Sequence, residues 1–208
     1  MTADALSVAG LQQAARPIAR RERGYLAGVL ARAFEDDALS RWVYRDHPSR
    51  MRWVRADFRL RMAQHAADRL SYTTDELDGA AIWAAPGQWK GHVIGQWRAL
   101  GAIPRVARNH QRISAMQREL DRRHPADPHL YLALLGVAAG ARRRGRATAL
   151  LAPTLALADR RRLPAYVEAG SDAAASVYGT LGFTSIGRVE LSTAPIVHLM
   201  WREPRPVA

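Results

Sequence analysis

The stretch LYLALLGVAAGARRRGRATALLA, residues 130–152, decides the fold. Its apolar run over 130–137 is typical of a buried strand. A short turn follows, and an arginine-rich segment then opens a helix predicted over about 145–161. The first N–H groups of a helix have no partner within it and can bind an anion, while Gly145 lets the backbone approach closely and flanking arginines add charged donors. We therefore predict that this segment holds the pyrophosphate of a nucleotide-like ligand.

Size and composition predict one globular domain. The chain has 208 residues, of which 48% are hydrophobic, enough for a sizeable core. We place the domain at 15–204 and interpret 1–14 as a flexible tail. The longest apolar run is too short to span a bilayer, which takes about 20 residues, and the N-terminus lacks the pattern of a secretory signal. The absence of cysteine excludes disulfides and thiolate metal sites. We expect a cytoplasmic protein that needs no metal and no membrane.

The net charge of +12 comes almost entirely from arginine, since Lys90 is the only lysine. Such a charge attracts polyanions such as nucleic acid, or an anionic cofactor. Because the arginines are spread along the whole chain, we interpret most of them as a solvated surface rather than a nucleic-acid site. The cluster over 142–146 is the exception.

Other patterns place the remaining elements. Helical spacing is found over 22–34 and 50–70, with Asp36 or Asp37 as the cap of a short helix between them. Two short strands, 70–74 and 80–84, form a hairpin. Residues 88–100 are interpreted as a helix or mobile lid, and 106–124 as a charged helix. A strand over 165–169, a helix from 171 or 172 to 181 that ends at Gly182, and strands over 183–191 and 196–201 complete the chain.

Two motifs carry a resemblance to a known family. The pattern Arg142-x-x-Gly145-x-Ala147 after a strand resembles the (Gln/Arg)-x-x-Gly-x-(Gly/Ala) signature of the GCN5-related N-acetyltransferase (GNAT) superfamily. The run YGTLGF, 178–183, is similar to that family's Tyr-x-x-Leu-Gly-Phe. Within the family, residues 130–202 and the segment IWAAP at 82–86 resemble the puromycin N-acetyltransferase-like subgroup.

The resemblance implies an α/β fold: a mixed, mostly antiparallel sheet of six or seven strands, flanked by helices. The sheet would be splayed where 130–137 meets 165–169, and acetyl-CoA would lie in the splay. It implies that the backbone around Leu135, Gly136 and Val137 contacts the pantetheine arm and the thioester oxygen. The pyrophosphate would face the Thr148 hydroxyl and the backbone N–H groups of Arg142, Arg143, Arg144, Gly145, Arg146 and Ala147.

The resemblance also implies direct transfer from acetyl-CoA to an amine. Tyr178 stands at the family's general-acid position, and a phenol with an ordinary pKa near 10 can donate at neutral pH. For the base we expect Glu168, beside the splay. The acidic residues 35–37 and His198 stay as further candidates, whereas His129 lies at the start of its strand and is expected to be too far out. The family's frequent Asn before the tyrosine is Ala174 here.

The N-terminal half is expected to shape the acceptor pocket, with Trp83, Glu35 and Asp36 as substrate-binding residues. We predict an acetyl-CoA-dependent N-acetyltransferase for a primary amine of a small molecule, with antibiotic-like compounds among the candidates. Three alternatives stay open: a protein lysine or N-terminal acetyltransferase, a non-catalytic acyl-CoA-binding protein, and a basic nucleic-acid-binding protein. The sequence leaves the choice between monomer and homodimer open.

Overall fold

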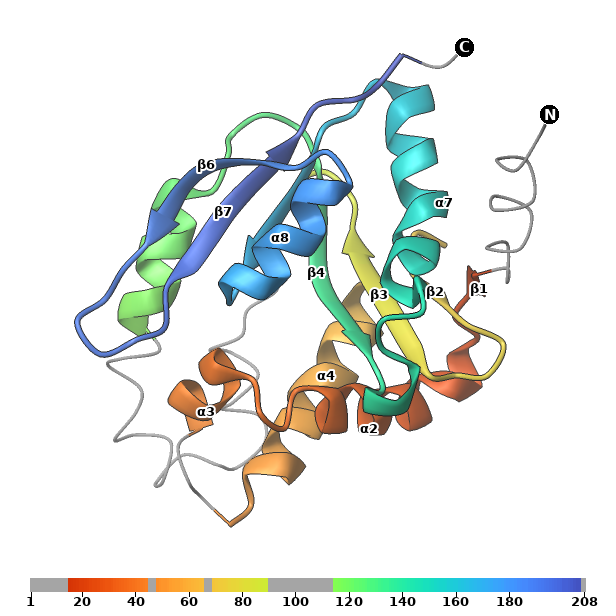
Figure 1. The fold of residues 1–208 in the computed structure, drawn as a ribbon, viewed down its shortest axis with the longest axis vertical. Helices are drawn as coiled ribbons and strands as arrows, with labels where there is room; N and C mark the ends of the chain where they lie inside the picture. Colours follow the sequence, from red (N-terminus) through yellow and green to blue (C-terminus); the bar gives the residue numbers. More distant parts are fainter. Residues whose placement is uncertain (1–14, 45–47, 66–68, 90–113, 207–208) are drawn as a thin grey trace, which may run out of the picture.

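The structure, a computed structural model, describes residues 15–44, 48–65, 69–89 and 114–206. A sheet of seven strands forms its centre (Figure 1). Neighbouring strands are antiparallel except β4 and β5, which are parallel. The predicted mixed, mostly antiparallel sheet is therefore confirmed. In spatial order the strands are β1 (Arg16–Pro17), β2 (Tyr72–Thr73), β3 (Gly79–Ala84), β4 (Leu130–Val137), β5 (Ala165–Ala169), β7 (Val197–Arg202) and β6 (Thr184–Val189).

The helices agree with the periodicity of the sequence. Those predicted over 22–34 and about 145–161 are confirmed, and the one predicted over 50–70 is described over 50–65 as α4. The interpretations of residues 1–14, 90–100 and 106–113 lie outside the described residues. Among the described helices, none is long and apolar enough to cross a membrane. The helices are η1 (Arg20–Glu22), α2 (Arg23–Ala33), α3 (Ala38–Tyr44), α4 (Arg50–His65), η2 (Ala139–Ala141), α7 (Arg146–Arg161) and α8 (Asp172–Thr180), with residues 114–123 also helical.

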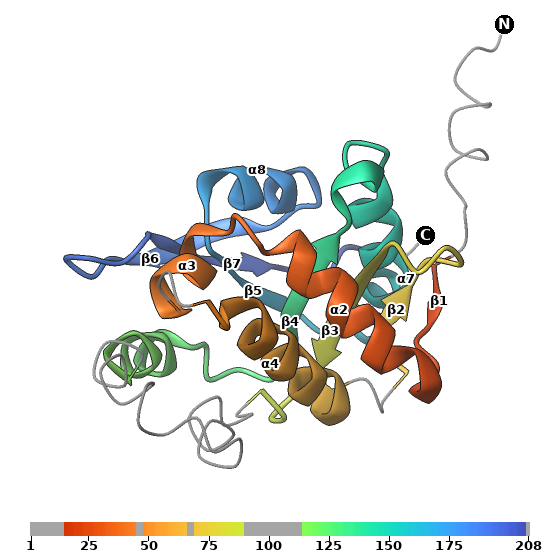
Figure 2. The same ribbon diagram turned by 90° about the horizontal axis from the view of Figure 1, so that it is seen from below.

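The helices cover the two faces of the sheet unequally. Figure 2 shows α7 and α8 on one side, and α2, α4 and the green helix over 114–123 on the other. On the α7 face, Leu132 and Val167 of the sheet pack with Leu151 of α7 in one buried cluster. On the opposite face, Leu134 packs with α2 and α4 in a second cluster, and Tyr166 packs with residues of 114–123 in a third. The sheet therefore separates two sets of side chains.

A bulge divides β4 into two halves. Strict alternation would place Leu134 on the same face as Leu130 and Leu132, but Leu134 packs on the other face. The register against β3 shifts between Ile82 and Trp83, so β4 contains one extra residue there. Pairing between β4 and β5 covers only residues 130–132 of β4. Beyond the bulge β4 therefore pairs with β3 alone, which is the predicted splay.

Local contacts fix the two helices that border the splay. The Ser171 hydroxyl accepts the Ala174 N–H at 3.2 Å and caps α8, and Gly182, with φ of 91°, ends it as predicted. At the far end of α7, the Arg202 guanidinium donates to both carboxylate oxygens of Asp159 at 2.8 and 2.9 Å. This bidentate pair fastens α7 to β7.

Candidate active site

The turn from β4 into α7 has the geometry of an anion site. Gly145 precedes the helix with φ of 73°, a conformation that favours glycine, and Arg143 is also at positive φ. The first helical hydrogen bond runs from the Ala149 N–H to the Gly145 carbonyl at 3.0 Å. The N–H groups of Ala147 and Thr148 lie before that bond, at the positive end of a 16-residue helix. The backbone is thus arranged to hold a phosphate.

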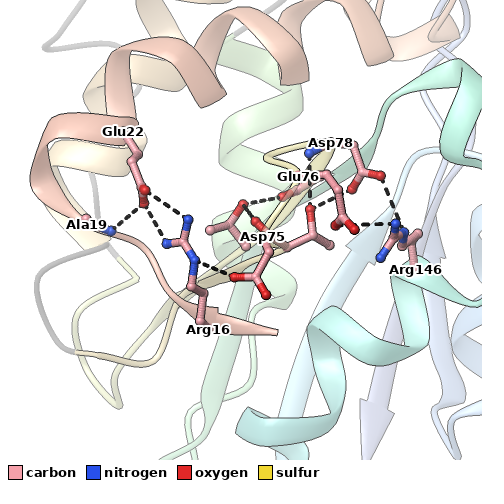
Figure 3. A network of polar contacts seen from close by, with 10 residues as sticks. Arg16, Ala19, Glu22, Asp75, Glu76, Asp78 and Arg146 are labelled. Carbon is pink, nitrogen blue, oxygen red and sulfur yellow. Dashed lines mark hydrogen bonds and ion pairs between the residues drawn. The ribbon is translucent and has the colours of Figure 1, made fainter. Parts of the chain in front are cut away.

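The arginine side chains of this turn serve different purposes. Arg142 donates to the carbonyls of Val137 and Ala33, at 3.2 and 2.6 Å, and so ties the turn to β4 and α2. Arg146 points away from the turn to Glu76 and Asp78, each at 3.3 Å (Figure 3). The expectation that both flanks supply phosphate donors is therefore corrected, because these guanidinium groups already have partners.

Arg143 and Arg144, in contrast, are exposed, and within the described part of the chain neither has an ion-pair partner. They are the two side chains of the run that remain available to an anionic ligand. The Thr148 side chain is exposed beside them at the start of α7.

The second half of β4 offers a backbone edge next to this turn. Leu135 and Val137 are partly buried on the α7 face. Gly136 faces α2 so closely that a Cβ would lie 2.6 Å from Leu30 Cδ2. Only glycine fits at this position without moving α2. The three residues expected to contact pantetheine thus lie together beyond the bulge, on the side where β5 has diverged.

Tyr178 lies against the splay from the α8 side. It is 7% exposed, and its ring contacts Phe183 at a centroid distance of 5.8 Å. Burial raises the pKa of Tyr178, so the phenol keeps its proton at neutral pH.

A cavity of about 220 Å³ lies on the opposite face. It is formed by segments that are far apart in the sequence: α3, α4, the helix over 114–123, and the strands β4, β5 and β7. Aromatic rings and carboxylates dominate the lining. The lining residues are Phe34, Asp37, Leu39, Ser40, Trp42, Val43, Tyr44, Asp57, Phe58, Arg61, Gln64, His65, Trp89, Met116, Gln117, Leu120, Asp121, Tyr131, Leu134, Glu168 and Val197.

Glu168 projects from β5 into this cavity and is the predicted base. Its carboxylate accepts hydrogen bonds from the Tyr131 hydroxyl at 3.1 Å and the Tyr166 hydroxyl at 3.4 Å. Burial, and then the charge of Glu168, raise the pKa of both phenols, so they remain donors. The side chain is 16% exposed. A carboxylate that is held by two phenols and still open to a cavity can take a proton from a bound amine.

The cavity contains a second group of charges. Asp57 and Arg61, one turn apart on α4, form an ion pair of 3.0 Å. Burial lowers the pKa of Arg61, but the neighbouring charge of Asp57 more than offsets this effect. The pKa of Arg61 is therefore raised. Burial raises the pKa of Asp37, which accepts the Ser40 N–H at 2.7 Å and so caps α3 as predicted. Among the described residues of the lining there are four carboxylates and one arginine, and this part of the lining favours a cationic ligand.

Three residues expected at the acceptor pocket lie elsewhere. Trp83 is fully buried in the cluster under α7, on the face away from the cavity, so its expected contact with substrate is corrected to core packing. Glu35 and Asp36 are exposed and do not line the cavity, and Asp36 pairs with Arg41 at 3.8 Å. Of the acidic residues 35–37, only Asp37 reaches it. His198 lies 2.9 Å from Asp172 and is not part of the lining.

Sequence reasoning missed a group of aromatic and imidazole side chains beside Glu168. His124 Nδ1 lies 3.7 Å from the carboxylate, and the Trp89 ring stacks on His124 with centroids 3.4 Å apart. His129, expected to be too far out, contacts His124 directly at 3.0 Å. One available signal was that Tyr131 and Tyr166 occupy equivalent positions of two parallel strands, so their hydroxyls converge.

No protein-family model matches the chain, whereas several solved structures share its fold. One, described as histone acetyltransferase HPA2 and related acetyltransferase from Corynebacterium glutamicum, has a TM-score of 0.65 and 24% identity over 94% of this chain and 98% of its own. Arylalkylamine N-acetyltransferase 2 from Aedes aegypti has a TM-score of 0.62 and 15% identity over 92% of this chain and 98% of its own. An agmatine N-acetyltransferase has a TM-score of 0.61 and 14% identity over 91% of this chain and 98% of its own. The chain has the GNAT acetyltransferase fold.

Proposed function

We propose that the chain is an acetyl-CoA-dependent N-acetyltransferase of the GNAT superfamily that acts on a primary amine of a small molecule. One observation carries the proposal. Pairing between β4 and β5 ends at residue 132, and Tyr178 packs in the cluster on the α7 face while Tyr131 and Glu168 line the cavity on the other face. A proton donor and a proton acceptor thus lie on opposite faces of the sheet, the arrangement that acyl transfer from a thioester to an amine would use.

The α7 face fits the acyl donor. The helix N-terminus with Gly145 suits the pyrophosphate, and exposed Arg143 and Arg144 suit further phosphate oxygens. The β4 edge beyond the bulge has no strand partner and can pair with the amides of a pantetheine arm. These features are contiguous, and they would place a thioester at the gap.

The opposite face fits a small amine. Its cavity of about 220 Å³ has the size for a small molecule rather than a protein segment. The aromatic rings of the lining suit an apolar body, and the carboxylates suit an ammonium group. The arylalkylamine and agmatine N-acetyltransferases of the same fold act on small amines by name, which supports this class. The resemblance to the puromycin-like subgroup adds aminonucleosides to the candidates.

The residues then have distinct tasks. Glu168 takes a proton from the bound ammonium, which leaves a nucleophilic amine. The amine attacks the thioester carbon that acetyl-CoA supplies when bound, and backbone N–H groups near Gly136 and Val137 are the proposed donors to the oxyanion. Tyr178 gives its proton to the departing sulfur, and the second proton of the attacking nitrogen restores the phenol; its raised pKa keeps it protonated until then.

The test is a thiol-release assay with purified protein, acetyl-CoA and a panel of acceptors: arylalkylamines, diamines, aminoglycosides, aminonucleosides and lysine peptides. Saturable release with a small amine, and none with peptides, supports the proposal. Release only with peptides would assign a protein substrate. Binding of acetyl-CoA without release from any acceptor would indicate a non-catalytic acyl-CoA-binding protein.

A further inference from the structure

The two histidines beside Glu168 form a pair with a defined arrangement of hydrogens. His129 Nδ1 lies 2.6 Å from the Asp127 carbonyl oxygen, and since a carbonyl only accepts, Nδ1 carries a hydrogen. Burial lowers the pKa of His129, so the ring is neutral and its Nε2 is an acceptor. His124 Nε2, at 3.0 Å from that atom, must therefore donate.

This arrangement leaves His124 with a free lone pair on the active-site side. In a neutral ring whose Nε2 is protonated, Nδ1 is an acceptor. That atom lies 3.7 Å from Glu168 Oε1, one small movement or one water away from a hydrogen bond. A proton that arrives on Glu168 therefore meets a basic nitrogen.

Aromatic rings surround His124. Its side chain is 1% exposed, and Trp89 stacks on it at 3.4 Å in the geometry of a cation–π contact. The Tyr131 and Tyr166 rings meet it edge-on at 5.5 and 4.7 Å. Among the described residues, the titratable groups that face it are Glu168, Tyr131, Tyr166 and His129, and burial keeps both phenols and His129 neutral at neutral pH.

We propose that the His124–His129 pair is the proton store of the active site: it takes from Glu168 the proton that Glu168 removes from the acceptor ammonium. This inference rests on the proposed transferase function. The added proton bonds to His124 Nδ1, and Glu168 becomes an anion again beside the new imidazolium. His129 stabilises that cation, because its Nε2 already accepts a hydrogen bond from the Nε2–H group of His124.

The proton balance of the reaction requires such a destination. An ammonium nitrogen loses two protons as it becomes an amide. The C–N bond forms, the C–S bond breaks, and one proton ends on the CoA sulfur through Tyr178. The other is surplus, and it passes from Glu168 to His124 and then to water when the product leaves. An imidazole is ordinarily a stronger base than a carboxylate. Storage on imidazole therefore makes the free amine more populated than storage on Glu alone.

The first test compares two acceptors in wild-type protein and His124→Gln. For a strongly basic alkylamine at neutral pH, the variant is expected to lose about 100-fold in kcat/KM. The loss should shrink as the pH approaches the pKa of the amine. For a weakly basic aromatic amine, which is already neutral, it should be less than about threefold. Equal losses for both amines at all pH values would indicate a structural role and overturn the proposal.

The second test does not depend on activity or on a folded variant. Long-range ¹H–¹⁵N NMR of the wild-type imidazole rings at neutral pH should show His129 as the Nδ1–H tautomer and His124 as the Nε2–H tautomer. If the His124 ring were protonated only on Nδ1, that atom could not take a proton from Glu168. This result would overturn the proposal of a proton store. An inactive protein with the expected tautomers would refute the transferase function while leaving the histidine arrangement in place.

Discussion

The two faces of the sheet contrast in how the sequence builds them. The candidate donor site on the α7 face comes from one contiguous stretch, residues 130–202, and it offers a ligand mainly backbone groups: a helix N-terminus and a strand edge that no described strand pairs with. The cavity on the other face is assembled from side chains of α3, α4, residues 114–123 and three strands. A site built from the backbone of one contiguous segment can therefore be recognised as a sequence motif. A site built from side chains that are distant in the sequence cannot.

The largest effect is expected on the cavity face, at Glu168. Glu168→Gln keeps the shape and can still accept from Tyr131 and Tyr166, but it cannot take a proton. We expect kcat to fall by about 10³-fold, within the range for acid–base groups, with an unchanged Kd for acetyl-CoA by calorimetry. A weaker Kd for acetyl-CoA with an unchanged kcat would show that Glu168 contributes to binding acetyl-CoA and not to proton transfer.

The next effect concerns the α7 face alone. The Arg202 side chain is 4% exposed, and Asp159→Asn removes its counter-charge. We expect the free energy of unfolding to fall by about 3 kcal/mol at neutral pH, as for other broken buried pairs, in urea titrations.

The pH dependence of the stability difference between wild type and Asp159→Asn distinguishes an effect of charge from an effect of packing. Hydrogen bonds from Arg202 are the main cause that lowers the pKa of Asp159, so the carboxylate contributes stability above its ordinary pKa and loses it as the pH falls through the lowered value. The difference between the two proteins should therefore be complete at pH 7 and should shrink below about pH 4. A difference that does not change with pH would show that packing, not charge, holds α7 to β7.

A smaller effect is expected at Tyr178, which packs on the α7 face. Tyr178→Phe retains the ring contact with Phe183 and removes the proton donor. We expect kcat to fall by about 100-fold, the lower end for a general acid, while the Kd of acetyl-CoA and the KM of the amine stay the same. Steady-state kinetics with both substrates varied will measure this, and an unchanged kcat would remove Tyr178 from the mechanism.

The smallest effect is expected at the exposed start of α7. Thr148→Ala removes one hydroxyl donor to the pyrophosphate, worth about 1 kcal/mol, so the Kd of acetyl-CoA should rise about fivefold. The amine KM should not change. Thr180→Ala on α8 is the matched control, because the Thr180 hydroxyl donates to the Val177 carbonyl within its own helix. Equal effects of both variants would argue against a phosphate contact at Thr148.

Much of the fold could be predicted because local rules decide it. The strands over 130–137 and 165–169, and the cap and end of α8 at Ser171 and Gly182, followed from periodicity and turn chemistry. The splay was predicted from the family resemblance and not from periodicity. It depends on one extra residue in β4, and an inserted residue leaves no mark in an apolar run such as LYLALLGV.

The side chains of the site were harder, because their partners are distant. Arg146 appeared free in the sequence, yet the turn before β3 brings Glu76 and Asp78 to it. Trp83 lies in a strand whose alternate residues face opposite layers, and the bulge decides which layer it meets. Neither spacing nor composition contains that information.

The central claim is that acyl donor and amine approach the gap between β4 and β5 from opposite faces. A crystal structure with CoA tests it most directly. We predict the pyrophosphate at the Gly145 turn, the sulfur between β4 and β5 beside the Tyr178 hydroxyl, and the Glu168 cavity still open. Pantetheine lying in the Glu168 cavity, or CoA bound away from the start of α7, would contradict the account.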